Sequence, residues 1–104
     1  MRVELLFSDG DPAAMSARQN LVEVLTEDAF ETPIQMVAVA SPEDAELLGM
    51  RGTPMIRIDG ADIDPEWAGP VGLDPRDYGD GPVPPKDLIR RAVERARGWG
   101  HGRR

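Results

Sequence analysis

Residues 49–58 read GMRGTPMIRI, and this stretch decides the fold expected of the chain. Gly49 is suited to the left-handed position that often follows the last residue of a helix. The apolar run after the proline predicts a strand over Met55–Ile58. Asp59-Gly60 separates this strand from a second strand-like run, Ala61–Ile63, and such a pair is a strong two-residue hairpin signal. The stretch therefore predicts a helix end, a proline turn and two antiparallel strands.

A strand and a helix are predicted at the start of the chain. Residues Val3–Phe7 alternate as a short strand that ends at a turn. Asp11 stands where a helix N-cap belongs, and Pro12 stands at the first helical position. The helix is expected to end near Ala29 or Phe30, before Pro33. Its apolar face should contain Ala14, Ala17, Leu21, Val24 and Leu25.

A second strand and a short second helix should lie between this helix and residue 49. Residues 33–40 predict a largely buried strand, parallel to the first because a helix connects the two. Ser41-Pro42, with acidic residues just after it, predicts the N-cap and first turn of the second helix.

The final third of the chain begins with a change of composition. Residues 65–84 contain five prolines and four glycines, which predicts a long irregular loop. Helical spacing of apolar residues then predicts a helix from Pro84 to about Arg97. One domain over residues 1–97 and a flexible basic tail over residues 98–104 are expected.

Charge limits the partners. The net charge is −7, but residues 1–85 carry −12 and residues 86–104 carry +5. An acidic body disfavours nucleic acid and anionic membranes, and cations near the end of a helix complement its dipole. No apolar run is long enough to span a membrane. A cytoplasmic protein that binds neither nucleic acid nor membrane is expected.

Two motifs carry a resemblance to a known family. Residues 49–54 resemble the G-I-R-G-I-P approach to the cis-proline of thioredoxins, and residues 9–12 (DGDP) lie where that family places its C-x-x-C motif. Across about nine-tenths of its length the chain is similar to small bacterial thioredoxin-like proteins. The resemblance implies an α/β thioredoxin-like fold in the order βαβ-α-ββα. It also implies a four-stranded mixed sheet with helices on both faces, and a cis peptide bond before Pro54.

The chain departs from this family wherever the family uses sulfur. It contains no cysteine. Asp11 and Ala14 occupy the motif positions, Pro75 occupies a later cysteine position, and Leu5 replaces the buried acid of thioredoxin. Disulfide exchange requires a thiolate. The chain is therefore not expected to be a thiol-disulfide oxidoreductase, and no cofactor is expected.

The resemblance implies a redox-inactive protein that binds a protein or peptide, or serves as an accessory module, through the former active-site end. The backbone of Thr53 would pair with an extended peptide. A second copy of the chain, bound through a sheet edge, is a further expected partner. The expected binding residues are Asp9, Gly10, Asp11, Pro12, Thr53, Pro54, Trp67 and Tyr78.

Alternatives remain open at several of these residues. Asp11 is either a plain N-cap or the anchor of a thiol-independent enzyme or small-molecule binder beside Pro54. Trp67 and Tyr78 either contact a partner or hold the 65–84 loop on the body. The acidic run of Asp59, Asp62 and Asp64 lacks the spacing of a calcium loop, so no metal site is expected. His101, alone among glycines, is not expected to be catalytic.

Overall fold

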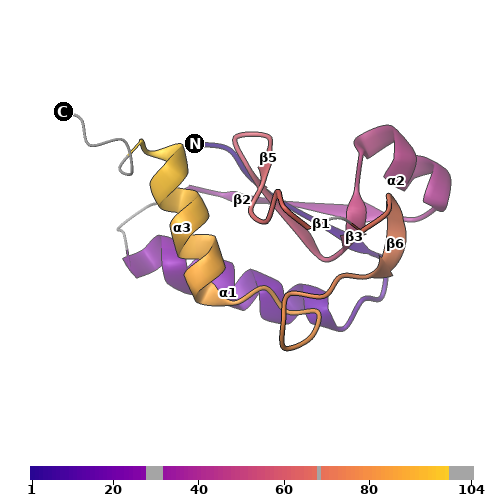
Figure 1. Cartoon of the computed structure of the whole chain (residues 1–104), viewed down its shortest axis with the longest axis horizontal. Coiled ribbons are helices and arrows are strands. Elements are labelled where there is room, and N and C mark those ends of the chain that lie inside the picture. Colours follow the sequence, from indigo (N-terminus) through magenta and orange to yellow (C-terminus); the bar gives the residue numbers. More distant parts are fainter. Residues whose placement is uncertain (28–31, 68, 99–104) are drawn as a thin grey trace.

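The computed structural model describes residues 1–27, 32–67 and 69–98. The chain is an α/β protein with a four-stranded mixed sheet and three helices among these residues (Figure 1). The helices are α1 (Ala13–Glu27), α2 (Pro42–Leu48) and α3 (Lys86–Ala96). The strands are β1 (Val3–Ser8), β2 (Ile34–Val39), β3 (Arg51–Thr53), β4 (Met55–Ile58), β5 (Ala61–Asp62) and β6 (Gly72–Pro75).

The main sheet has the strand order β2-β1-β4-β5. Strands β1 and β2 are parallel, as the intervening helix predicted, with Val3 opposite Ile34. Strand β4 pairs antiparallel with both β1 and β5. Strands β2 and β5 therefore form the two edges of this sheet.

Two hydrophobic clusters hold the elements together. The larger cluster joins α1 and α3 to alternate residues of β1 and β4, including Leu5 and Ile56. The smaller cluster is formed by Leu6, Val39, Ala45, Met50 and Met55. Consecutive residues of a strand point to opposite sides, so neighbouring residues of β1 belong to different clusters. All five residues predicted for the apolar face of α1 are buried.

The local signals around α2 and the hairpin are confirmed. The Ser41 hydroxyl accepts a hydrogen bond from the Asp44 amide at 3.1 Å, and Gly49 ends the helix with φ 65°. Asp59 and Gly60 both have positive φ, as a tight hairpin between β4 and β5 requires. The peptide bond between Thr53 and Pro54 is cis, as expected from the resemblance.

Two expectations were wrong. The segment over residues 65–84 is not wholly irregular, because it contains β6, which pairs in parallel with β3 in a separate two-stranded sheet. Pairing between segments some twenty residues apart leaves no local pattern in the sequence. The glycine and proline of β6 are also residues that are uncommon in strands. Strand β2 is not largely buried, since only Val39 is buried and β2 is an edge strand.

Some expectations lie outside the described residues, including the end of the first helix near Ala29 or Phe30 and the position of His101. In the described ranges, the helices are too short or too polar to cross a membrane.

Candidate functional site

The turn between β1 and α1 carries the first group of predicted site residues. Asp9 and Gly10 are exposed, whereas Asp11 is half-buried. The Asp11 amide donates to the Ser8 carbonyl oxygen at 2.9 Å, and Asp11 Oδ1 accepts from the Ala13 amide at 2.9 Å. Asp11 therefore caps the start of α1, in agreement with the simpler of its two interpretations.

The other carboxylate oxygen of Asp11 binds the residue before the cis-proline. The Thr53 hydroxyl donates to Asp11 Oδ2 at 2.6 Å, and the same hydroxyl oxygen accepts from the Ser8 amide at 2.9 Å. Thr53 is only 4% exposed. Hydroxyl–carboxylate hydrogen bonds of this length are charge-assisted and strong. Both oxygens of Asp11 thus have donors within the chain, and they tie α1 to β3.

An open depression of about 230 Å³ adjoins this hydrogen-bond network. Its lining combines the 9–12 turn and Ser8 with Thr53 and two residues of β6, Leu73 and Pro75. The structure therefore brings five predicted site residues together: Asp9, Gly10, Asp11, Pro12 and Thr53.

Strand β6 lies along the backbone of β3, where the resemblance implied a bound peptide. The Arg76 amide donates to the Thr53 carbonyl oxygen at 3.0 Å, and the Gly72 amide donates to the Met50 carbonyl oxygen at 2.9 Å. The Thr53 carbonyl is thus paired within the chain. A peptide that paired with this carbonyl would compete with the Arg76 amide for it.

Arg76 is a central residue that sequence reasoning did not single out. Its side chain has no exposed surface and makes a two-pronged contact with Asp62, at 2.7 and 2.9 Å. It also donates to the carbonyl oxygen of Asp64 at 2.9 Å. A buried charge is stable only when paired and hydrogen-bonded, and Asp62 supplies that pairing. Arg76 Nε has no hydrogen-bond partner in the part of the chain that the structure describes.

The two aromatic residues of the 65–84 segment enclose this arginine. The Arg76 guanidinium lies 4.6 Å from the ring centre of Trp67 and 5.1 Å from that of Tyr78. The Tyr78 hydroxyl donates to the Pro54 carbonyl oxygen at 2.6 Å. Burial raises the pKa of the Tyr78 phenol above its ordinary value. Both aromatics hold the segment on the body, and neither lines the depression beside Asp11.

Gly52 explains how β6 comes so close to β3. Its φ of +85° is unfavourable for other residues. A Cβ atom at this position would lie 3.0 Å from the Cβ of Arg76 and 3.2 Å from the Trp67 ring. The second glycine of the opening motif therefore makes room for the Arg76 cluster, which consists of Arg76, Asp62, Trp67 and Tyr78.

The acidic run after β4 is engaged in structural contacts. Asp59 Oδ1 accepts from the Arg2 amide at 2.7 Å, and both oxygens of Asp62 bind Arg76. Over residues 1–27, 32–67 and 69–98, the structure contains no group of three or more acidic, histidine or cysteine side chains arranged to hold a metal ion.

A sequence signal for the Arg76 cluster did exist. A single arginine stands in an otherwise uncharged or acidic Pro/Gly-rich segment, between two aromatics and after an acidic run. Nothing in that pattern specifies which acid pairs with the arginine, since Asp62 lies 14 residues away in the sequence.

Comparison with known proteins adds no further assignment, because no protein-family model, curated protein or solved structure matches this chain.

Proposed function

We propose that this chain is a redox-inactive, thioredoxin-like module that binds another protein through its α2 end. We define the α2 end as the 9–12 turn, α2 and β6. The mixed strand pairing and the cis peptide before Pro54 support this fold. The smaller hydrophobic cluster also supports this fold. It contains Ala45 of α2 but no residue of α1 or α3, as expected if α2 covers the face of the sheet opposite to those two helices.

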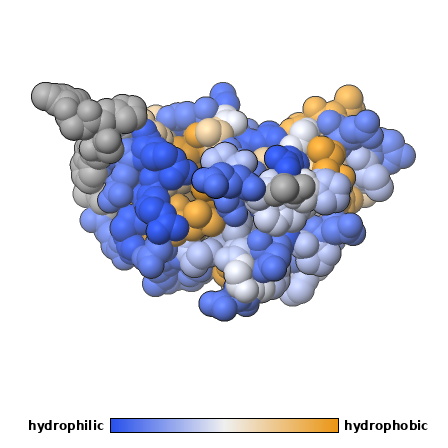
Figure 2. Space-filling view, viewed as in Figure 1, coloured by the Kyte–Doolittle hydropathy of each residue, from blue (hydrophilic) through white to orange (hydrophobic). Residues whose placement is uncertain are grey.

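The observation that carries the binding proposal is a group of exposed apolar side chains at the α2 end. Leu47 is 85% exposed, Leu48 40% and Val71 48%. Val71 directly precedes Gly72, whose amide binds the Met50 carbonyl just after α2, so these side chains belong to one region. Figure 2 shows hydrophobic residues gathered at the end of the molecule that α2 occupies. Exposed apolar groups with polar surroundings are typical of protein-binding surfaces.

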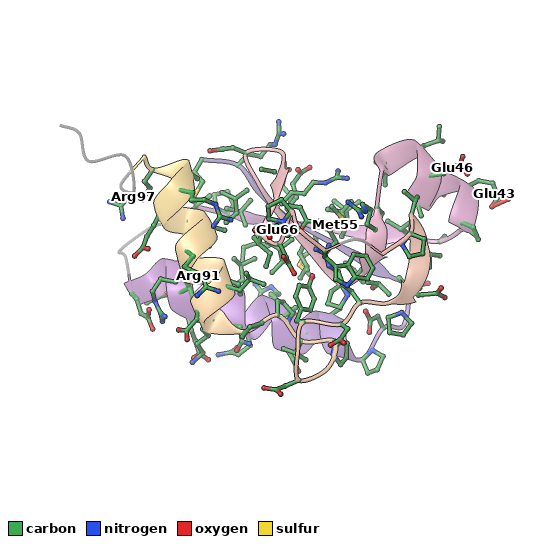
Figure 3. All side chains as sticks on the ribbon, viewed as in Figure 1. Glu43, Glu46, Met55, Glu66, Arg91 and Arg97 are labelled. Carbon is green, nitrogen blue, oxygen red and sulfur yellow. The ribbon has the colours of Figure 1, made fainter. Side chains whose placement is uncertain are left out.

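The charges around this patch indicate the chemistry of the partner. Glu43 and Glu46 project from α2 away from the body (Figure 3). Asp44 is also exposed, and the 9–12 turn contributes exposed Asp9. We therefore propose a partner with an apolar surface surrounded by lysine or arginine, because opposite charges favour encounter and orientation.

Contact through side chains fits the structure better than backbone pairing at Thr53. The Thr53 carbonyl is already paired with Arg76, and β6 fills the edge of β3. The alternative of a catalytic or small-molecule site at Asp11 is less favoured, because both Asp11 oxygens accept hydrogen bonds within the chain.

The test is a quantitative pull-down from a lysate of the native host with three forms of the chain. Leu47→Glu places a charge in the proposed patch, and Met15→Glu places the same charge at another exposed apolar position, on α1. We expect a specific partner to be retained by the wild type and by Met15→Glu, and lost by Leu47→Glu. Recovery of no specific partner, or equal loss with both variants, would argue against the proposal. Insulin reduction should remain at the uncatalysed rate.

A further inference from the structure

The two edges of the main sheet are protected very differently. Strand β5 is two residues long and ends at Asp62, with Asp59 before it and Asp64 after it. Short length and charge are the usual means of preventing edge-to-edge pairing. Strand β2 is six residues long, contains no charged residue and no proline, and pairs only with β1 in the described ranges. One edge is therefore blocked and the other is open.

The open edge also exposes apolar side chains. Met36 is 38% exposed and Ala38 is exposed as well, and the other exposed residue of the strand, Gln35, is polar but uncharged. Met36 lies beside Leu5 in the β1–β2 pairing, so it points to the sheet face that α1 covers. An exposed methionine on an uncharged edge strand is a feature that a binding partner would bury.

The backbone groups that face outward can be identified. The Val39 carbonyl accepts a hydrogen bond from the Asp9 amide at 3.4 Å, so the polar groups of Val39 face β1. Backbone groups alternate in direction along a strand. The N–H and C=O groups of Ile34, Met36 and Ala38 therefore point away from the sheet.

We propose that β2 pairs antiparallel with β2 of a second copy of this chain, around a two-fold axis that passes through Met36. In this register Met36 faces Met36 of the other copy and Ile34 faces Ala38. Ile34, Met36 and Ala38 then all form hydrogen-bonded pairs. A register centred on Val37 would leave Ile34 without a partner residue in β2 of the other copy. The two sheets become one continuous sheet.

Closure favours a second copy over other occupants, and the absence of charge on β2 permits it. Each chain carries a net charge of −7, so most surfaces of two copies repel each other. An uncharged strand brings no like charges together when it pairs with itself. A two-fold contact uses the same patch on both copies, so a dimer leaves no free β2 edge for a third chain. The short, charged β5 edges then prevent the joined sheet from adding chains at its ends. The inference concerns the sheet edge and does not depend on the proposed function of the α2 end.

The first test is the mass of the chain in solution, measured by light scattering after size-exclusion chromatography over a concentration series. We expect the wild type to have twice the mass of one chain. Met36→Lys places two ammonium groups at the axis and should weaken the dimer by about tenfold or more. Leu47→Lys, an equal change at an exposed position outside β2, should leave the dimer intact. Far-UV circular dichroism checks that both variants fold.

A second test uses the absence of cysteine from the chain. The Cα atoms of a hydrogen-bonded antiparallel pair lie about 5.5 Å apart, within the range for a disulfide. Met36→Cys should therefore form a covalent dimer under mild oxidation, much faster than the control Leu47→Cys. A wild-type chain that is monomeric at its highest soluble concentration would overturn the proposal. So would equal crosslinking of the two variants, or a dimer that Leu47→Lys disrupts and Met36→Lys does not.

Discussion

At the scale of single residues, Asp11 connects two parts of the chain that are 42 residues apart. One carboxylate oxygen caps α1 and the other accepts the Thr53 hydroxyl. The N-cap was predictable because it depends on the adjacent helix start. The bond to Thr53 was not, because it depends on how β3 lies against the start of α1.

Loss of the Asp11 carboxylate should therefore cost more than loss of a cap alone. We expect Asp11→Ala to destabilise the chain by about 1–2 kcal/mol through the cap, and further through the unpaired Thr53 hydroxyl. Urea unfolding of Asp11→Ala, Thr53→Val and the double variant measures the coupling, expected at about 0.5–3 kcal/mol. Asp9→Ala, at an exposed position in the same turn, is the control. Additive effects would show that the Asp11–Thr53 bond contributes nothing.

Tyr78 provides a pH test, since it is the only tyrosine of the chain. Burial raises the pKa of its phenol, so the folded state keeps the proton at a pH where the unfolded state loses it. Tyr78 therefore stabilises the fold fully below its unfolded pKa of about 10, and this contribution declines as pH rises further. Ultraviolet titration should give a higher midpoint in the native chain than in urea. Identical midpoints would contradict the buried position of the phenol.

At the scale of elements, β6 depends on partners distant in sequence. It pairs with β3, and the residue that follows it, Arg76, forms a salt bridge with Asp62. Its own composition, rich in glycine and proline, predicts a loop. The hairpin of β4 and β5 shows the opposite behaviour, because its turn residues specify it locally.

Replacement of the buried arginine should release β6 before the main sheet is affected. We expect Arg76→Met to destabilise the chain by about 3–5 kcal/mol, because Asp62 loses its charged partner. Amide hydrogen exchange should then accelerate at Gly72 and Arg76, whose N–H groups bind Met50 and Thr53. Arg91→Met, at an exposed position of α3, is the matched control. Unchanged exchange at β6 in a folded Arg76→Met variant would show that other contacts hold this strand.

At the scale of the whole molecule, the charge distribution should control self-association. Residues 1–85 carry −12, and two such bodies repel each other when β2 joins β2. Salt screens this repulsion, with a Debye length that falls from about 10 Å at 0.1 M to about 3 Å at 1 M. We expect the dimer to tighten between these salt concentrations. A dimer that weakens with salt would indicate an ionic contact, such as α3 against the acidic body, in place of the β2 edge.

The sequence by itself determined the local features: the α1 cap at Asp11, the turn at Asp59-Gly60, the ends of α2 and the absence of any thiol. These depend on residues a few positions apart, or on composition alone. Only the tertiary structure decided that β6 pairs with β3, that Arg76 is buried against Asp62, and that β2 is an exposed edge. Each of these depends on which distant segments become neighbours, and the same residue types would satisfy the local rules in many other arrangements.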